Sequence, residues 1–212
     1  MDLKWINRVK HLSIQGQWET LYNDKKKVQE DGKSIWGKGN VYRNSKKLVD
    51  LLPGVLEELG IKTFTDIGCG DFLWLSQLDW SKIDYHGYDI VRPLIKENRK
   101  NYSGFKFDVL DLIEDECPKS DMIFVRSVFI HTCLQGCLRM IENIKASGSK
   151  YLMASTLPYI EENHNTKCLW LVKRNLQIEP FNFPEPLYLI PEMDRDDRPN
   201  NFMGVWKIED LS

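Results

Sequence analysis

The chain has 212 residues, of which 42% are hydrophobic, and its formal net charge at pH 7 is -2. This length suits one domain with a substantial core, so we expect a single domain over residues 1–212. The balanced charge argues against nucleic acid as the main partner, and no apolar stretch has the length of a membrane span. With no signal-peptide pattern and five scattered cysteines, we expect a cytoplasmic protein with reduced thiols.

Residues 1–60 are predicted to form an N-terminal helical cap and a loop. Apolar residues recur at helical spacing from the start of the chain, which favours a helix packed over the end of a sheet. The glycine-rich stretch 31–40 is typical of a mobile loop. Asn44 or Ser45 can cap the next helix, and Pro53 lies inside it, where it could kink or divide that helix.

Residues 63–75 are the most informative stretch of the chain. A β-prone run ends near Asp66, passes through Gly68 and Gly70, and enters a second apolar segment, which predicts a strand, a tight turn and the start of a helix. The first N-H groups of that helix would face a ligand in the turn. A dinucleotide site needs a third glycine where Leu73 stands. Asp66 would repel a diphosphate but suits a cofactor with an ammonium or sulfonium group.

Three further strands follow, and two of them carry an acid near their carboxyl end. Residues 85–90 contain Asp89, which can accept hydrogen bonds from both hydroxyls of a ribose. Residues 105–109 contain Asp108, and the apolar run 121–127 is typical of a strand buried on both faces. Each acid taken singly could be a solvated residue at a strand end. Their order along the chain favours a nucleoside-like cofactor.

Strands and helices alternate over residues 62–155, which predicts a parallel sheet with right-handed crossovers. A helix is expected over residues 134–145 and a fifth strand over residues 150–156. Residues 187–190 and 202–208 are predicted to be two further strands.

The glycine turn resembles motif I of the class I methyltransferases that use S-adenosylmethionine (SAM), and residues 121–127 resemble motif IV. A wider resemblance, over about residues 36–211, is to a group of small bacterial methyltransferases. It rests on the patterns Gly37-x-Gly39, Asp66-x-Gly-Cys-Gly-Asp-Phe-x-Trp74, Arg126-Ser-Val-x-Ile-His131, Gly148-Ser-Lys-Tyr-Leu152, Pro180-Phe-Asn-Phe-Pro-Glu-Pro-Leu187 and Gly204-Val-Trp206.

This resemblance implies an α/β, Rossmann-like fold: a seven-stranded, mostly parallel sheet with helices on both faces and the last strand antiparallel. Residues 61–212 would form that core, with a substrate-lid insertion at about residues 157–186. The implied cofactor is SAM, with S-adenosylhomocysteine (SAH) as product. Asp108 would contact the adenine amino group, and Asp71 would either cap the first helix or meet the amino group of SAM. The implied cofactor contacts are Trp36, Gly39, Asp66, Gly68, Cys69, Gly70, Asp71, Asp89, Ile90, Asp108, Val109 and Arg126.

Acceptor contacts are expected from two flanking segments. Trp36 lies in a glycine-rich loop that could close over a ligand, although it could equally anchor a surface loop. Residues 180–187 carry three prolines, which exclude a helix. Their side chains could line a pocket, or the segment could be a rigid connector packed on the core. The predicted acceptor contacts are Arg126, His164, Phe181, Asn182 and Glu185.

One departure from the resembled group limits this transfer. Related chains commonly carry Asn-x-Asp-Ile and then Gly-x-Trp-Arg before the proline segment. Residues 163–170 here have neither the acid nor the arginine at the expected places. Acceptor contacts in that region therefore cannot be carried over.

His131 is the candidate general base, because imidazole can take a proton near neutral pH. It could instead be a structural residue at a helix start, and His164 is a second candidate base. Arg126 would anchor an anionic acceptor or stabilise its own loop. Cys133 and Cys137 lie near His131 but lack further ligands, so no metal site is predicted.

The resulting expectation is methyl transfer to oxygen or nitrogen of a small molecule or glycan precursor. A protein or RNA methyltransferase and a non-catalytic SAM-binding partner protein are the alternatives. The sequence leaves the oligomeric state open.

Overall fold

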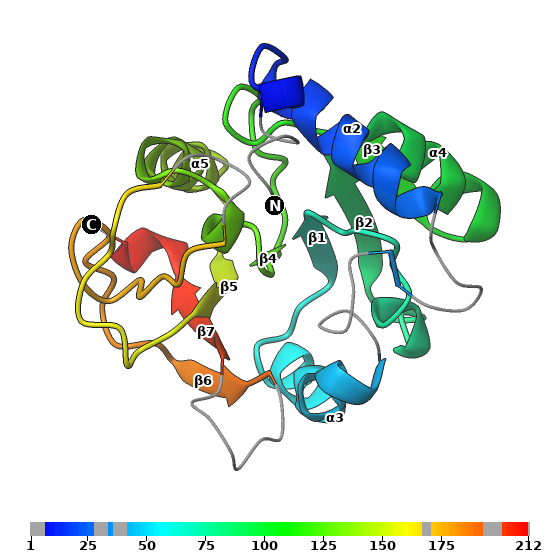
Figure 1. The fold of residues 1–212 in the computed structure, drawn as a ribbon. Coiled ribbons are helices and arrows are strands. Elements are labelled where there is room, and N and C mark those ends of the chain that lie inside the picture. The colour runs from blue at the N-terminus through cyan, green and yellow to red at the C-terminus, as the bar shows by residue number, and fades with distance from the viewer. Residues whose placement is uncertain (1–6, 28–33, 36–41, 167–170, 193–200, 212) are drawn as a thin grey trace.

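The computed structural model describes residues 7–27, 34–35, 42–166, 171–192 and 201–211. Its centre is a seven-stranded sheet with the order β3-β2-β1-β4-β5-β7-β6 (Figure 1). Strands β1 to β5 pair in parallel, and β7 pairs antiparallel with both β5 and β6. This confirms the predicted mostly parallel sheet with an antiparallel last strand. The strands are β1 Thr63–Ile67, β2 Asp84–Asp89, β3 Lys106–Val109, β4 Met122–Val125, β5 Tyr151–Thr156, β6 Tyr188–Pro191 and β7 Phe202–Lys207.

Helices cover both faces of the sheet and one of its edges. Helices α3 (Tyr42–Glu58) and α4 (Arg92–Asn101) lie on one face, and α5 (Leu134–Ala146) lies on the other. Helix α2 (Ile14–Lys26) runs beside α4 (Figure 1). The hydroxyl of Ser13 caps α2 by accepting from Gly16 N, so the N-terminal helical pattern is interrupted there. Helix α3 begins at Tyr42, ahead of the predicted caps, and contains Pro53.

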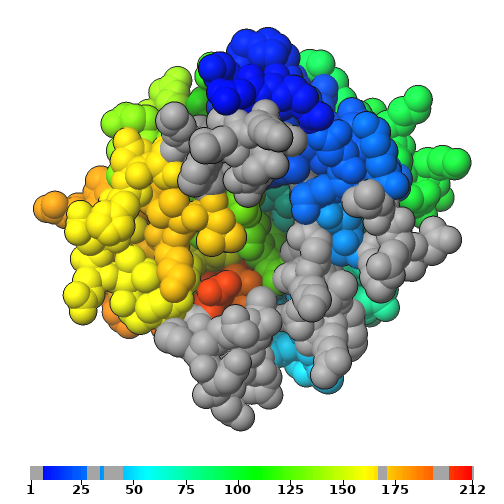
Figure 2. Space-filling model, viewed as in Figure 1, coloured from blue at the N-terminus to red at the C-terminus, as the bar shows by residue number. Residues whose placement is uncertain are grey.

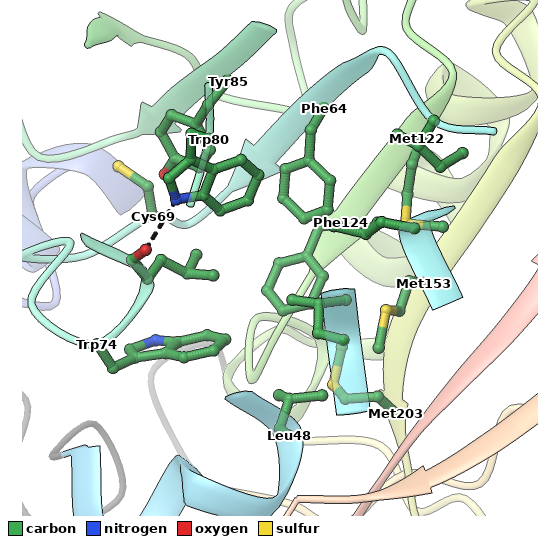
Figure 3. Close-up of a cluster of buried hydrophobic side chains, with 14 of the residues drawn as sticks. Leu48, Phe64, Cys69, Trp74, Trp80, Tyr85, Met122, Phe124, Met153 and Met203 are labelled. Carbon is green, nitrogen blue, oxygen red and sulfur yellow. Dashed lines mark hydrogen bonds between the residues drawn. The ribbon is translucent and has the colours of Figure 1, made fainter. Parts of the chain in front are cut away.

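The core on the α3 face combines aliphatic side chains with many aromatic and sulfur-containing ones (Figure 3). Phe64 of β1 contacts the rings of Trp80, Tyr85 and Phe124, with centroids 5.1, 6.1 and 5.3 Å away. Trp80 also donates from Nε1 to the carbonyl of Leu75 at 2.8 Å, so its polar atom is satisfied inside the core. The crossover from β1 to β2 is thereby fixed against the sheet.

That crossover contains no α-helix among its residues, which corrects the predicted helix after the glycine turn. Only a short 3-10 turn, η2 (Leu75–Gln77), is present. Phe72, Trp74 and Leu75 are all buried, whereas in a helix Trp74 would point to the side opposite Phe72. Phe72 also has a φ of 56°, in the left-handed region that ends a right-handed helix.

The amino-terminal edge of the parallel strands is held together by Asp121, which precedes β4. Its Oδ2 accepts from the backbone N-H groups of Lys62 and Thr63 at 2.9 and 3.1 Å. Its Oδ1 lies 2.7 Å from Lys150 Nζ, just before β5. These donors lower the pKa of Asp121 to about 2, even though partial burial acts in the opposite direction.

Within the described ranges, no helix is long and apolar enough to cross a membrane. No disulfide joins the described cysteines, Cys69, Cys117, Cys133 and Cys137.

Candidate cofactor and active site

The glycine turn after β1 packs directly on the segment that follows β4. Gly68 and Gly70 have φ angles of 75° and 58°, in the region that glycine adopts without steric cost. A Cβ atom at Gly68 would lie 2.5 Å from Val128 Cγ2, so the turn also needs the absence of a side chain there. The turn is therefore fixed at the carboxyl edge of the sheet, where ligands bind in open α/β folds.

The backbone donors of this turn do not face a ligand, contrary to the prediction. Gly68 N and Cys69 N both donate to the carbonyl of Tyr88, at 2.7 and 2.9 Å. Gly70 N donates to Asp89 Oδ2 at 3.1 Å. Because these N-H groups are used by β2 and no helix follows, the turn is not built to bind phosphate.

Asp89, at the end of β2, is buried beside the turn. Its Oδ1 accepts from Val91 N at 3.0 Å, and its Oδ2 accepts from Gly70 N. Burial raises the pKa of Asp89 to about 6 despite these backbone hydrogen bonds. Each carboxylate oxygen can accept a second hydrogen bond, so the side chain keeps capacity for two ligand hydroxyls.

Asp66, in β1, is the second buried carboxylate, with 2% of its surface exposed. The hydroxyl of Tyr85 donates to its Oδ2 at 2.6 Å. Burial raises the pKa of Asp66 to about 7, against the lowering effects of Tyr85 and Arg126. Neither Asp66 nor Asp89 forms an ion pair with any residue that the structure describes.

Tyr85 is a site residue that the sequence analysis missed. Its ring lies in the aromatic core, and its hydroxyl reaches Asp66 past Gly87. A Cβ atom at Gly87 would lie 2.9 Å from that hydroxyl and 2.8 Å from the ring of Phe107. A glycine inside a strand two residues after a tyrosine was the available signal for this close approach.

The other predicted cofactor residues near these acids differ in their exposure and in their contacts. Val109 pairs with Asp89 across β2 and β3 and is 39% exposed, so an apolar surface lies beside the carboxylate. Ile90 is half-buried, and Asp108 contacts Arg99 and His86, the latter at 2.7 Å. Cys69 is buried, which raises the pKa of its thiol.

Asp71 has a local structural role in the described part of the chain. It accepts from Ile35 N at 3.0 Å and from Leu73 N at 3.4 Å, so it holds the loop before α3 and caps no helix. Trp36 and Gly39 lie outside the described residues.

Arg126 is buried at the end of β4 and engaged inside the protein. Its guanidinium lies 3.2 Å from Glu192 Oε2 and 4.7 Å from the ring centroid of Trp74. Glu192, 1% exposed, also accepts from Ser155 Oγ at 2.9 Å, and Ser155 Oγ in turn accepts from Ser127 N. These contacts support the predicted loop-stabilising role of Arg126. Glu192 was missed because it lies 66 residues away in the sequence.

His131 ends the 3-10 turn η3 (Phe129–His131) that follows β4. Its Nδ1 is buried and has no hydrogen-bond partner in the described structure. Trp18 of α2 packs edge-on against the imidazole, with ring centroids 5.8 Å apart. Burial, with a smaller effect of Lys25, lowers the pKa of His131, so the imidazole is neutral at pH 7.

Helix α2 spans the carboxyl edge of the sheet above the glycine turn. Gln15 Nε2 donates to the carbonyl of Ile90 after β2, and Trp18 contacts His131 after β4, while β1 lies between these strands. The space-filling view shows a hollow at the centre of this face, with blue residues of the N-terminal part on one side and the yellow 157–166 region on another (Figure 2).

Three predicted acceptor contacts lie in the proline segment, which packs against the core. Phe181 is 3% exposed and belongs to the core under α5. Trp206 donates to the carbonyl of Pro184 and pairs with Leu152 near the amino end of β5, away from the glycine turn. The exposed Asn182 and Glu185 follow this connector, and Glu185 accepts from Gln177 at 2.9 Å.

His164, the second candidate base, lies at the surface of the described structure. Its side chain is 71% exposed and lies 3.3 Å from Glu162. No group of three or more His, Cys, Asp or Glu side chains suitable for a metal ion occurs among the described residues.

No protein-family profile and no curated protein matches this sequence, whereas solved structures are similar to it in fold. The magnesium protoporphyrin IX methyltransferase ChlM from Synechocystis PCC 6803, with bound SAH, has a TM-score of 0.65 and 14% identity. That similarity covers 92% of this chain and 97% of the other. The chain has the class I methyltransferase fold.

Two further structures share this methyltransferase fold. The N-methyltransferase NodS from Bradyrhizobium japonicum WM9, in complex with SAH, has a TM-score of 0.62 and 11% identity, over 88% of this chain and 97% of NodS. The methyltransferase domain of bacterial CtHen1 has a TM-score of 0.56 and 14% identity, over 76% of this chain and 98% of that domain.

Proposed function

We propose that the protein is a SAM-dependent methyltransferase. The observation that carries this proposal is the pair of buried carboxylates, Asp66 and Asp89, at the ends of adjacent parallel strands. Burial raises both pKa values because it penalises the charged carboxylates, and the nearby Arg126 offsets this only partly at Asp66. A ligand that brings positive charge and hydroxyl donors would relieve this cost.

SAM has these properties, because it carries a sulfonium, an ammonium and a ribose with two hydroxyls. Asp89 would accept the ribose hydroxyls, and Asp66 would face the cationic amino-acid end. Val109 and Ile90 offer apolar surface for the adenine, with Asp108 near its amino group. The glycine turn supports this assignment, since its N-H groups are used internally and offer little to a diphosphate. The solved ChlM and NodS structures, which contain bound SAM or SAH, also support it.

The proposed reaction is methyl transfer to oxygen or nitrogen of a small molecule or glycan precursor. Bound SAM supplies an electrophilic methyl group, so the protein mainly has to align and desolvate the acceptor. His131 would accept the proton of the acceptor, because it is neutral and follows β4 under Trp18. The balanced net charge supports a small acceptor over nucleic acid.

Two measurements test this proposal. Calorimetric titration of the purified protein with SAM and SAH should show binding of both, and absence of binding would refute the cofactor assignment. Incubation with radiolabelled SAM and a panel of sugar nucleotides and small metabolites should then label an acceptor. Binding without any labelled acceptor would favour a non-catalytic SAM-binding protein.

The role of His131 is tested separately. Once an acceptor is found, His131→Ala should slow turnover by roughly a hundredfold while SAM affinity is retained. His11→Ala is the matched control and should keep the wild-type rate, because His11 is exposed and belongs to none of the predicted contacts. An unchanged rate in the His131 variant would assign this residue a structural role.

A further inference from the structure

The insertion after β5 (residues 157–186) donates hydrogen bonds to the backbone on both sides of His131. Val172 N donates to the carbonyl of Ile130 at 2.8 Å. Arg174 donates from a terminal guanidinium nitrogen to the carbonyl of Thr132 at 3.0 Å. These two carbonyls belong to the residues immediately before and after His131. His131 N and the Thr132 hydroxyl both donate to the carbonyl of Val128. The short turn is therefore fixed by its own hydrogen bonds and by those from the insertion.

Arg174 is unusual because its whole side chain is buried. It is 0% exposed and forms no ion pair with a described residue. Its guanidinium donates to the carbonyls of Thr132 and His164, and its Nε has no partner. Burial of an uncompensated guanidinium is costly, and an apolar side chain would fill the same space without that cost. What the guanidinium adds is a link between the insertion and the turn that ends at His131.

The insertion itself is rigid enough to act as an anchor, although it lacks regular secondary structure. Asn163 Nδ2 donates to the carbonyls of Asn175 and Glu179, and Asn175 N donates back to Asn163 Oδ1. Asn175 Nδ2 also donates to Pro158 and Ile160. These buried hydrogen bonds from side chains to the backbone hold the described parts of the insertion together.

The imidazole of His131 lacks the usual means of orientation. A histidine base commonly has its second ring nitrogen held by a carboxylate or a carbonyl. Here Nδ1 has no partner among the described residues, and Trp18 packs edge-on against the ring. The position of the His131 backbone is therefore a main determinant of where the ring lies.

We propose that Arg174 is a positioning residue for His131, acting through the peptide that follows it. This inference rests on the proposed function, in which His131 receives a proton from the acceptor. Arg174 and the Val172 backbone keep the turn in place, so the free imidazole points in one direction. A misplacement of about 1 Å in such a site can reduce turnover by roughly a hundredfold.

Two variants test this role: Arg174→Met, which keeps most of the volume, and Arg174→Lys, which keeps one donor. The ring resonances of 13C-labelled histidine, with His131 assigned from the His131→Asn variant, report its environment directly. In Arg174→Met the His131 signal should shift or broaden, while the His11 and His86 signals stay in place. In Arg174→Lys the His131 signal should lie between those of wild type and Arg174→Met. If Arg174→Met does not fold, a shift of the His131 signal in Arg174→Lys serves as the test instead.

Two control variants separate positioning from general loosening. Asn163→Ala weakens the insertion without removing the bond to Thr132, and Arg139→Met removes an exposed arginine of α5. Both should leave the His131 signal closer to wild type than Arg174→Met does. Equal changes in Asn163→Ala and Arg174→Met, or no change in Arg174→Met, would overturn the proposal.

Turnover provides the functional readout. With an acceptor in hand, Arg174→Met should lower kcat by about tenfold or more, with SAH affinity within about twofold of wild type. A wild-type kcat would overturn the positioning role. Failure of the wild-type protein to bind SAH would instead refute the proposed function, and the histidine resonances would still report whether Arg174 orients the ring.

Discussion

The pKa values of aspartates at the two edges of the central sheet are shifted in opposite directions. At the amino edge, Asp121 receives two backbone N-H groups and the ammonium of Lys150, which lower its pKa to about 2. At the carboxyl edge, Asp66 and Asp89 form no ion pair with a described residue, and burial raises their pKa values to about 7 and 6. An ionised aspartate is therefore stabilised at the amino edge, whereas at the carboxyl edge burial makes the ionised form unfavourable. This contrast locates the place where a cationic ligand is expected.

The largest expected effect concerns Asp89. Asp89→Ala should weaken SAH binding by at least about a hundredfold, because two charge-assisted hydrogen bonds to the ribose are lost. The matched control is Asp84→Ala at the other end of the same strand, where Asp84 forms only an exposed pair with Lys106. Calorimetry on both folded variants compares them, and equal affinities would contradict the ribose assignment.

Asp66→Asn should stabilise the ligand-free protein at alkaline pH. The pKa of folded Asp66, about 7, lies above its unfolded value of about 4, so the folded state binds more protons between these values. Its contribution to stability therefore falls as the pH rises through this window, and asparagine removes that loss. We expect the free energy of unfolding at pH 8 to rise by roughly 2–4 kcal/mol, with the gain vanishing near pH 4.

Urea unfolding of the wild type and this variant across the pH range measures the difference. The same variant should bind SAM more weakly, because the charge that faces the cationic end is gone. A variant that is less stable than wild type at pH 8 would show that the ionised carboxylate is already compensated within the fold.

SAM affinity should rise with pH as Asp66 ionises. The ligand favours the deprotonated carboxylate, so binding releases a proton while the free protein is protonated, below about pH 7. We expect affinity to increase by about tenfold between pH 6 and pH 8. Calorimetry in two buffers of different ionisation enthalpy counts the released protons. A pH profile as steep in Asp66→Asn as in wild type would assign the proton to another group.

The smallest effect is expected at the amino edge. Asp121→Asn should lower the free energy of unfolding at pH 7 by about 1 kcal/mol, because its hydrogen bonds lose their charge and solvent screens the rest. The folded pKa is depressed, so the contribution is present above about pH 4 and disappears as the pH falls toward 2. SAH affinity should be unchanged, and a marked loss of affinity would show that the two edges are coupled.

Much of the fold and part of the site could be read from local patterns. The strands that carry Asp66, Asp89 and Asp108 were predicted because apolar runs and glycines act over a few residues. The prediction of a helix after the glycine turn was wrong. Phe72, Trp74 and Leu75 are instead buried in the aromatic core, in a conformation that a helix does not allow. The burial of Phe181 under α5 could not be read from the proline segment alone, because it depends on contacts with residues far away in the sequence.

The sequence by itself determined where the strands lie along the chain, the glycine turn and the acids beside it. These features depend on neighbouring residues and on the two-residue period of a strand. Only the tertiary structure decided which polar groups meet. Tyr85 reaches Asp66 across two strands, Glu192 pairs with Arg126 over 66 residues, and Arg174 bonds to Thr132 over 42. Such pairs form where distant segments of the chain pack together and must satisfy each other's buried polar atoms, and no local pattern records that choice.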